Sequence, residues 1–146
     1  MGKLGKRPGK LPTESVSYLV EFAENEFRLA RPLPNGQGTY RDELESFARQ
    51  TGRTPFELRG HEMPLELAHV WGWFRELSAV RGSNGWGPNP ISYREIEAWA
   101  GLTGALITAP EVQLIMQLDG LYIAAVEEAM EQKRVWINQQ RQQPGR

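Results

Sequence analysis

The stretch from residue 81 to residue 102 reads R-G-S-N-G-W-G-P-N-P-I-S-Y-R-E-I-E-A-W-A-G-L, and it decides how the chain folds. Its first ten residues, 81–90, are rich in Gly, Pro and Asn, which favour tight turns; we call them the Gly/Pro loop. The remainder contains Ser92-Tyr-Arg-Glu95, a capping box that predicts the start of a helix. Because helical patterns lie on both sides, we expect the loop to be a rigid corner that fixes two helices against each other and presents Trp86 at its tip.

Outside this stretch, apolar residues recur at three- and four-residue steps, the spacing of helices with one buried face. The pattern predicts four helices and a long final one, over 14–30, 40–50, 64–80, 92–100 and 108–138. Two more capping boxes, Thr54-Pro-Phe-Glu57 and Thr108-Ala-Pro-Glu111, predict the starts of a short helical turn and of the long helix. Gly52 is placed to end the second helix in a left-handed conformation.

The long helix is predicted to lie at the centre of the fold. Its first half carries two apolar stripes, so it is apolar on most sides and is expected to be packed from two directions. One stripe continues as far as Met130. Gly72, inside the third helix, indicates a close helix crossing, because glycine there costs about 1 kcal/mol relative to alanine. The sequence therefore predicts an all-α fold, a compact bundle of about five helices around a long C-terminal helix. Residues 1–12 would form a basic flexible arm, 13–138 a single helical domain, and 139–146 a polar and basic tail.

Composition narrows the class of protein. Hydrophobic residues make up 40% and charged residues 24%, which is typical of a globular chain. There is no cysteine, which excludes disulfides and thiolate sites, and no apolar run approaches the roughly 18 residues of a membrane span. We therefore expect no membrane association.

The net charge of −1 is unevenly distributed. Residues 1–12 and 133–146 carry four basic residues each and no acidic residue, whereas the part between them holds 9 basic and 18 acidic residues. Basic ends on an acidic body can solubilise the chain, contact an acidic patch on a neighbouring copy, or contact nucleic acid. The candidate contact residues of these arms are Lys3, Lys6, Arg7, Lys10 and Arg141.

No pattern of catalytic residues stands out, and we predict no enzyme activity, cofactor or metal. His61 and His69 lie near Glu62 and Glu66, but the H-E-x-x-H spacing of a helical zinc site is absent, and a partly exposed helix histidine is the favoured interpretation of His69. The glycines of the Gly/Pro loop match no phosphate-binding fingerprint and follow no strand.

Asp119 interrupts the apolar stripe of the long helix, where an unpaired carboxylate would be costly. The favoured interpretation is a salt bridge or helix-cap contact, with Arg81 or Arg94 as partner; the alternative is a polar contact with another subunit. Trp73 and Trp86 are the tryptophans least easily buried, and exposed aromatic residues often anchor interfaces. The candidate partner-binding residues are Trp73, Trp86, Pro88, Pro90 and Asp119.

The last two helices resemble a helix-turn-helix in order, but the second begins Glu111-Val-Gln-Leu-Ile-Met-Gln-Leu-Asp119. It is apolar and acidic where a recognition helix needs groups for phosphates and bases. Nucleic acid is therefore not an expected partner, although the basic arms leave a non-specific contact open.

The order of signals over residues 70–122 resembles the tail assembly chaperone family of long-tailed bacteriophages. The matching positions are Trp71, Phe74, Leu77-Ser78, Arg81, Gly85 to Pro90, Ile91 to Glu95, Trp99, Leu102-Thr-Gly104, Pro110-Glu111, Leu118-Asp119 and Tyr122. The chain departs from the family pattern at Gly85-Trp86-Gly87, where paired glycines are usual, and at Ala109-Pro110-Glu111, which replaces Pro-Trp-Glu.

The resemblance implies a non-catalytic tail-assembly protein, either chaperone-like or a structural component of the virion tail. Its partners would be the tape-measure protein or tail tube subunits, bound through helical and aromatic surfaces, with self-association as a further option. It would act in the host cytoplasm during assembly, and the second location to consider is the tail of the virion. The alternative is a small helical DNA-associated or regulatory protein that uses its basic ends.

Overall fold

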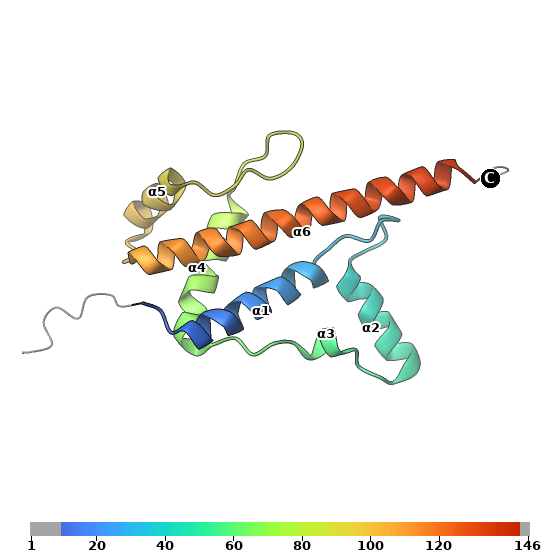
Figure 1. The fold of residues 1–146 in the computed structure, drawn as a ribbon, viewed down its shortest axis with the longest axis horizontal. Coiled ribbons are helices and arrows are strands. Elements are labelled where there is room, and N and C mark those ends of the chain that lie inside the picture. The colour runs from blue at the N-terminus through green and yellow to red at the C-terminus, as the bar shows by residue number, and fades with distance from the viewer. Residues whose placement is uncertain (1–9, 144–146) are drawn as a thin grey trace, which may run out of the picture. The chain divides into compact units, whose positions relative to one another are not determined.

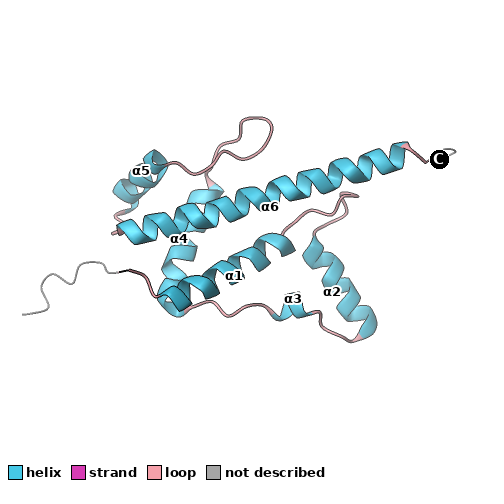
Figure 2. Cartoon of the chain, viewed as in Figure 1, coloured by secondary structure: helices cyan, strands magenta, loops and turns pink. Residues whose placement is uncertain are grey.

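The computed structural model describes residues 10–143, and this part of the chain is all-α (Figures 1 and 2). It contains six α-helices and one 3-10 turn, and its only β-type pairings are two isolated bridges. The elements are α1 (Thr13–Leu29), α2 (Tyr40–Thr51), α3 (Phe56–Arg59), η1 (Leu65–Leu67), α4 (Ala68–Ala79), α5 (Tyr93–Thr103) and α6 (Ala109–Arg141). The predicted all-α class and the long C-terminal helix are confirmed.

Capping boxes begin three of these helices. Ser92 caps α5 together with Glu95, and Thr108 caps α6, where the Thr108 amide donates to Glu111 at 2.9 Å, as the sequence predicted. A third box, made by Thr39 with Asp42 at the start of α2, was not anticipated. Each box satisfies amides that the first helical turn leaves without a partner inside the helix.

The capping box predicted at Thr54 is wrong. Helix α3 begins one residue later than predicted, after Pro55, and no side chain caps it. Glu57 then occupies the second helical position instead of the third, so it is not placed to complete a capping box. The prediction at Gly52 is confirmed, since this residue ends α2 in the left-handed region at φ 70°.

Gly72 does not mark a helix crossing. A Cβ built on this residue would have no neighbouring atom within 4 Å, and the residue is exposed on α4. The predicted close approach is therefore wrong, and the glycine has no packing role in α4.

Contacts among the described residues divide the chain into two units, and helices α1 and α6 run through both. The first unit comprises residues 10–21 and 62–120 and holds most of the buried apolar side chains. The largest fully buried members of its core are Leu19, Leu67, Val70, Phe74, Ile91, Ile115 and Leu118. The second unit comprises residues 22–61 and 121–143, with Ala23, Asn25 and Leu29 as its buried residues.

Burial along α6 is correspondingly uneven. All of its buried residues lie between Glu111 and Asp119, in the first unit. Met130, which the sequence placed on an apolar stripe, is 49% exposed. The second half of the helix therefore leaves apolar side chains accessible. Among the described residues, no helix has both the length and the apolar character needed to span a membrane.

Candidate functional site

An ion pair between Arg81 and Asp119 lies inside the first unit. The guanidinium Nη2 lies 2.6 Å from the Asp119 Oδ1, and the two side chains are only 6% and 5% exposed. The other carboxylate oxygen accepts the backbone amide of Ile91 at 2.8 Å. Asp119 therefore forms a salt bridge, one of the two contacts that the sequence favoured, and it also accepts the amide of the residue just before the cap of α5. The partner is Arg81, whereas Arg94 is exposed on α5.

Arg81 also holds the base of the Gly/Pro loop. Its Nη1 donates to the carbonyl of Asn89 at 3.0 Å, and its Nη2 donates to the hydroxyl of Ser78 at 3.0 Å. One guanidinium thus joins the end of α4, the returning arm of the loop and α6. Five donors in a fixed plane make arginine suited to such a junction.

The Gly/Pro loop connects α4 to α5 and projects as a loop that turns back on itself (Figure 1), with an isolated bridge between Ser83 and Pro88. The amide of Asn89 donates to the carbonyl of Gly82 at 2.8 Å, and the amide of Asn84 donates to that of Gly87 at 3.1 Å. The Asn84 side chain accepts the amides of Trp86 and Gly87 across the turn. Gly85 has a φ of 88°, a conformation that residues with a Cβ rarely adopt.

Trp86 stands at the tip of this turn with 84% of its surface exposed. The bonds that shape the turn involve backbone atoms and the side chains of Ser83 and Asn84, and none uses the indole. Pro88 is half-buried beside it and Pro90 is exposed. Hydrogen bonds close this turn and its aromatic ring is accessible, whereas the expected rigidity of the corner and its role in binding stay predictions.

Trp73 lies in a different setting, within a row of rings in the first unit. Its ring centroid lies 4.9 Å from that of His69 and 5.6 Å from that of Trp99. The Trp99 indole donates to Glu76 at 3.0 Å. Trp73 is half-buried, so only part of its ring is available to a partner.

His69 pairs with a carboxylate and not with other metal-binding groups. Its Nε2 contacts the Glu111 Oε2, and its side chain is 44% exposed, as expected of a partly exposed helix histidine. Burial acts to raise the pKa of Glu111, but the hydrogen bonds from His69 and Thr108 outweigh it and hold the pKa below its usual value. Residues 10–143 contain no group of three His, Cys, Asp or Glu side chains arranged to hold a metal ion.

Among the candidate residues of the basic arms, Lys10 and Arg141 are exposed. Lys3, Lys6 and Arg7 lie outside the described residues. The structure thus places Lys10 in the first unit and Arg141 in the second, at the end of α6.

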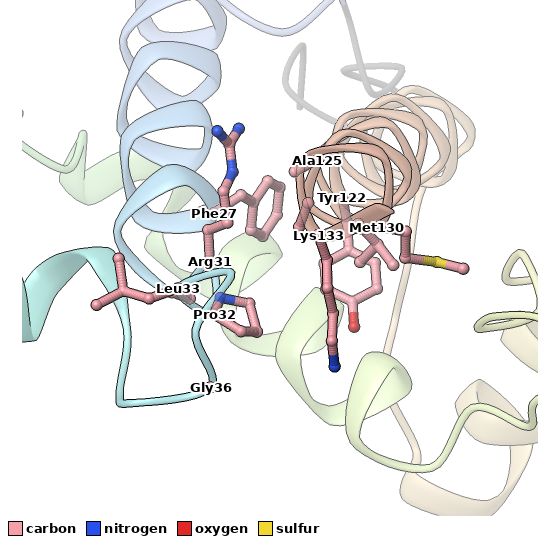
Figure 3. A pocket seen from close by; sticks show the side chains of 12 residues that line it. Phe27, Arg31, Pro32, Leu33, Gly36, Tyr122, Ala125, Met130 and Lys133 are labelled. Carbon is pink, nitrogen blue, oxygen red and sulfur yellow. The ribbon is translucent and has the colours of Figure 1, made fainter. Parts of the chain in front are cut away.

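A groove that the sequence did not reveal lies in the second unit, between the end of α1 with its following loop and the second half of α6 (Figure 3). We call it the α6 groove; its volume is about 480 Å³, and its lining is mostly apolar. Phe27 and Tyr122 meet edge to face there, with ring centroids 5.5 Å apart. The only signal in the sequence was the apolar stripe through Tyr122 and Met130, which a covered helix face would show equally well.

The family model of the phage tail assembly chaperones matches residues 47–124, more than half of the chain. The matched part contains α4, the Gly/Pro loop, α5 and the Arg81–Asp119 pair. This is an all-α chain of the tail-assembly class, and it belongs to the phage tail assembly chaperone family. Membership implies interaction with phage tail proteins, and proteins of this family are generally not enzymes. No curated protein and no solved structure matches the chain.

Proposed function

We propose that this protein binds apolar helical segments of the tape-measure protein and keeps them from aggregating before the tail is assembled. The observation that carries the proposal is the family match over residues 47–124. Tail tube subunits are the second candidate partner. The protein would act without catalysis, in the host cytoplasm.

The exposed apolar surface of the first unit supports a binding role. Trp86, Leu102, Leu106 and Val80 are each more than three-quarters exposed. Covering a large apolar side chain is worth about 1.5–3 kcal/mol, and tryptophan is one of the residue types enriched among those that dominate interface energies. A partner that covered Trp86 would therefore gain substantial affinity from one residue.

The other candidate residues fit this role in different ways. Pro88 and Pro90 follow Trp86 in the returning arm of the loop and limit its conformations, because proline fixes φ. Trp73 offers part of its ring. Asp119 is buried, and we propose that it acts on a partner by holding the start of α5 and, through Arg81, the base of the Gly/Pro loop.

The basic arms have a separate proposed role. Lys10 and Arg141, with Lys3, Lys6 and Arg7 from the sequence, would contact acidic surfaces of neighbouring tail proteins. Such contacts would also suit a component that stays in the virion tail or associates with itself. We further propose that residues 13–138 fold as one domain, because α1 and α6 are each continuous through both units.

The test is co-expression of the full chain with the tape-measure protein of the same phage, with the soluble fraction of the tape-measure protein as the readout. We expect the chain to raise that fraction and Trp86→Ala to reduce the gain by more than half. Phe56→Ala is the matched control, since it removes another exposed aromatic ring, 67% accessible, on α3. An unchanged soluble fraction for both the tape-measure protein and the tail tube protein would overturn the proposal. Tight binding of random duplex DNA that weakens steeply with salt would favour the DNA-associated alternative.

A further inference from the structure

The α6 groove is apolar along its floor and walls. Phe27 lines it from α1, Pro32 and Leu33 from the loop that follows α1, and Tyr122, Val126 and Met130 from α6. The small side chains Ala125 and Ala129 and the glycine Gly36 leave the space between them open. At about 480 Å³ the hollow falls within the roughly 300–1,000 Å³ of ordinary ligand sites.

Every charged residue that lines this groove is basic. Arg31 and Lys133 are the two, and Arg31 is already paired with Glu128 at 2.9 Å. Within residues 10–143, Lys133 has no ion pair. The lysine therefore stands at the edge of an apolar surface with its charge uncompensated by the chain itself.

The basic character continues along α6. Met130 and Lys133 also line a second hollow, which extends over Ile137 to Arg134 and Arg141 and again includes no carboxylate. Arg134 is paired with Glu131 at 2.7 Å, whereas Arg141 has no ion pair among the described residues. The apolar groove thus passes into a surface with two uncompensated cations, Lys133 and Arg141.

We propose that the α6 groove and this basic extension bind one amphipathic helix of a tail protein, apolar over about two turns and acidic beyond them. Tyr122 and Met130 are eight residues apart on α6, which is about 12 Å or two helical turns. An apolar helix face with anchors at i, i+3, i+4 and i+7 spans a similar length, about 10 Å. Acidic residues in the adjoining turns would then lie over Lys133 and Arg141.

The charge of the groove argues against the chain's own arm as the occupant. Residues 1–12 carry four basic residues and no acidic one, the same sign as the groove lining. Like charges brought together across an interface are costly, so the groove favours an acidic partner segment. The proposal rests on the proposed function, since it names the class of partner segment that a tail assembly chaperone would hold.

Two synthetic helical peptides of about 20 residues test the inference with the full chain. Both carry leucines at i, i+3, i+4 and i+7, one flanked at both ends by glutamates and the other by lysines, and fluorescence anisotropy gives their affinities. We expect the glutamate peptide to bind at least about tenfold more tightly than the lysine peptide. Its affinity should fall as salt is added, because salt screens the attraction between exposed charges. Equal affinity for the two peptides, or no binding of either, would overturn the inference.

Two variants locate the binding site. Lys133→Glu reverses the charge of the exposed lysine, and Ala129→Glu places a negative charge inside the groove. Each substitution is expected to lower the affinity for the glutamate peptide at least about fivefold. Arg94→Glu is the matched control, because it makes the same charge change on an exposed residue of α5, and it should leave binding unchanged. If both groove variants bind the glutamate peptide as tightly as the unaltered chain does, the inference fails. If sedimentation also shows that the unaltered chain forms a dimer and that both variants lose it, the occupant of the groove is a second copy of the chain.

Co-expression separates this inference from the proposed function. A chain that solubilises the tape-measure protein equally well with and without Lys133→Glu leaves the proposed function standing and contradicts the groove assignment. A chain that binds the glutamate peptide through Lys133 but solubilises neither tail protein supports the groove and contradicts the proposed function.

Discussion

Replacing Asp119 by alanine should lower the free energy of unfolding by about 3–5 kcal/mol, the usual cost of breaking a buried ion pair by removing one partner. The substitution leaves the Arg81 guanidinium, 6% exposed, without its counter-ion. It also removes the acceptor of the buried Ile91 amide, and an unsatisfied buried donor costs about 1–3 kcal/mol. Both losses result from removing the same carboxylate. The cost of the unsatisfied Ile91 amide is therefore already contained in the figure of about 3–5 kcal/mol and is not added to it.

Urea denaturation followed by circular dichroism measures this change, with Glu97→Ala as the control. Glu97 is an exposed acid on α5, and its removal should alter stability by less than about 0.5 kcal/mol. Asp119→Asn keeps the shape of the side chain and an acceptor for Ile91, so it should cost less than Asp119→Ala.

A double-mutant cycle with Arg81→Met tests the pair itself. If the two side chains act as an ion pair, the double variant should be more stable than the sum of the single losses predicts, with a coupling of about 0.5–3 kcal/mol. A loss below about 1 kcal/mol for Asp119→Ala, or additive effects in the cycle, would refute the reasoning, since a buried pair in contact must show both.

Three further predictions concern other parts of the chain. Gly72→Ala should stabilise the protein by about 0.5–1 kcal/mol, because α4 has open space there; Gly85→Ala, at φ 88°, should destabilise it in the same urea titration. Because the folded-state pKa of Glu111 lies below its ordinary 4.5, its contribution to stability is present above about pH 5 and is lost as the pH falls through the folded value. Denaturant midpoints between pH 6 and pH 3 should therefore fall less steeply for Glu111→Gln, and an unchanged slope would contradict this. Leu29→Ala changes the core of the second unit, whereas four of the five tryptophans lie in the first unit. If the two units unfold together, this substitution should lower the thermal midpoint measured by tryptophan fluorescence. An unaltered midpoint would show that the two units unfold separately.

The parts of the fold that follow from local sequence were predictable. A capping box is formed by residues within four positions of each other, so it can be recognised from local sequence alone. The boxes predicted at Ser92 and Thr108 both occur in the structure. The same motif failed at Thr54 because it also requires the helix to begin at the next residue, and α3 begins after Pro55. Asp119 was predictable for another reason: a carboxylate on an apolar stripe needs a partner, and few cations are within reach.

The α6 groove could not be predicted in this way. Tyr122 and Met130 have the helical spacing of core residues, and that spacing does not say whether another element covers them. Whether they are covered depends on where Phe27 and the loop after α1 lie, about ninety residues earlier in the sequence. Periodicity identifies an apolar face; only the tertiary arrangement shows that this face forms a groove with cations at its edge.

The base of the Gly/Pro loop is expected to contribute to the stability of the fold, and its tip to the binding of a partner. At its base, Arg81 and Asp119 are buried and bonded to three elements, so any change there alters the fold and the presentation of the loop together. At its tip, Trp86 is 84% exposed, and the bonds that shape the turn do not use its side chain. Trp86→Ala should therefore leave the unfolding free energy within about 0.5 kcal/mol, as for other exposed positions. A loss of partner binding in that variant can then be assigned to the missing indole, whereas a loss in an Asp119 variant can be assigned only after its stability has been measured.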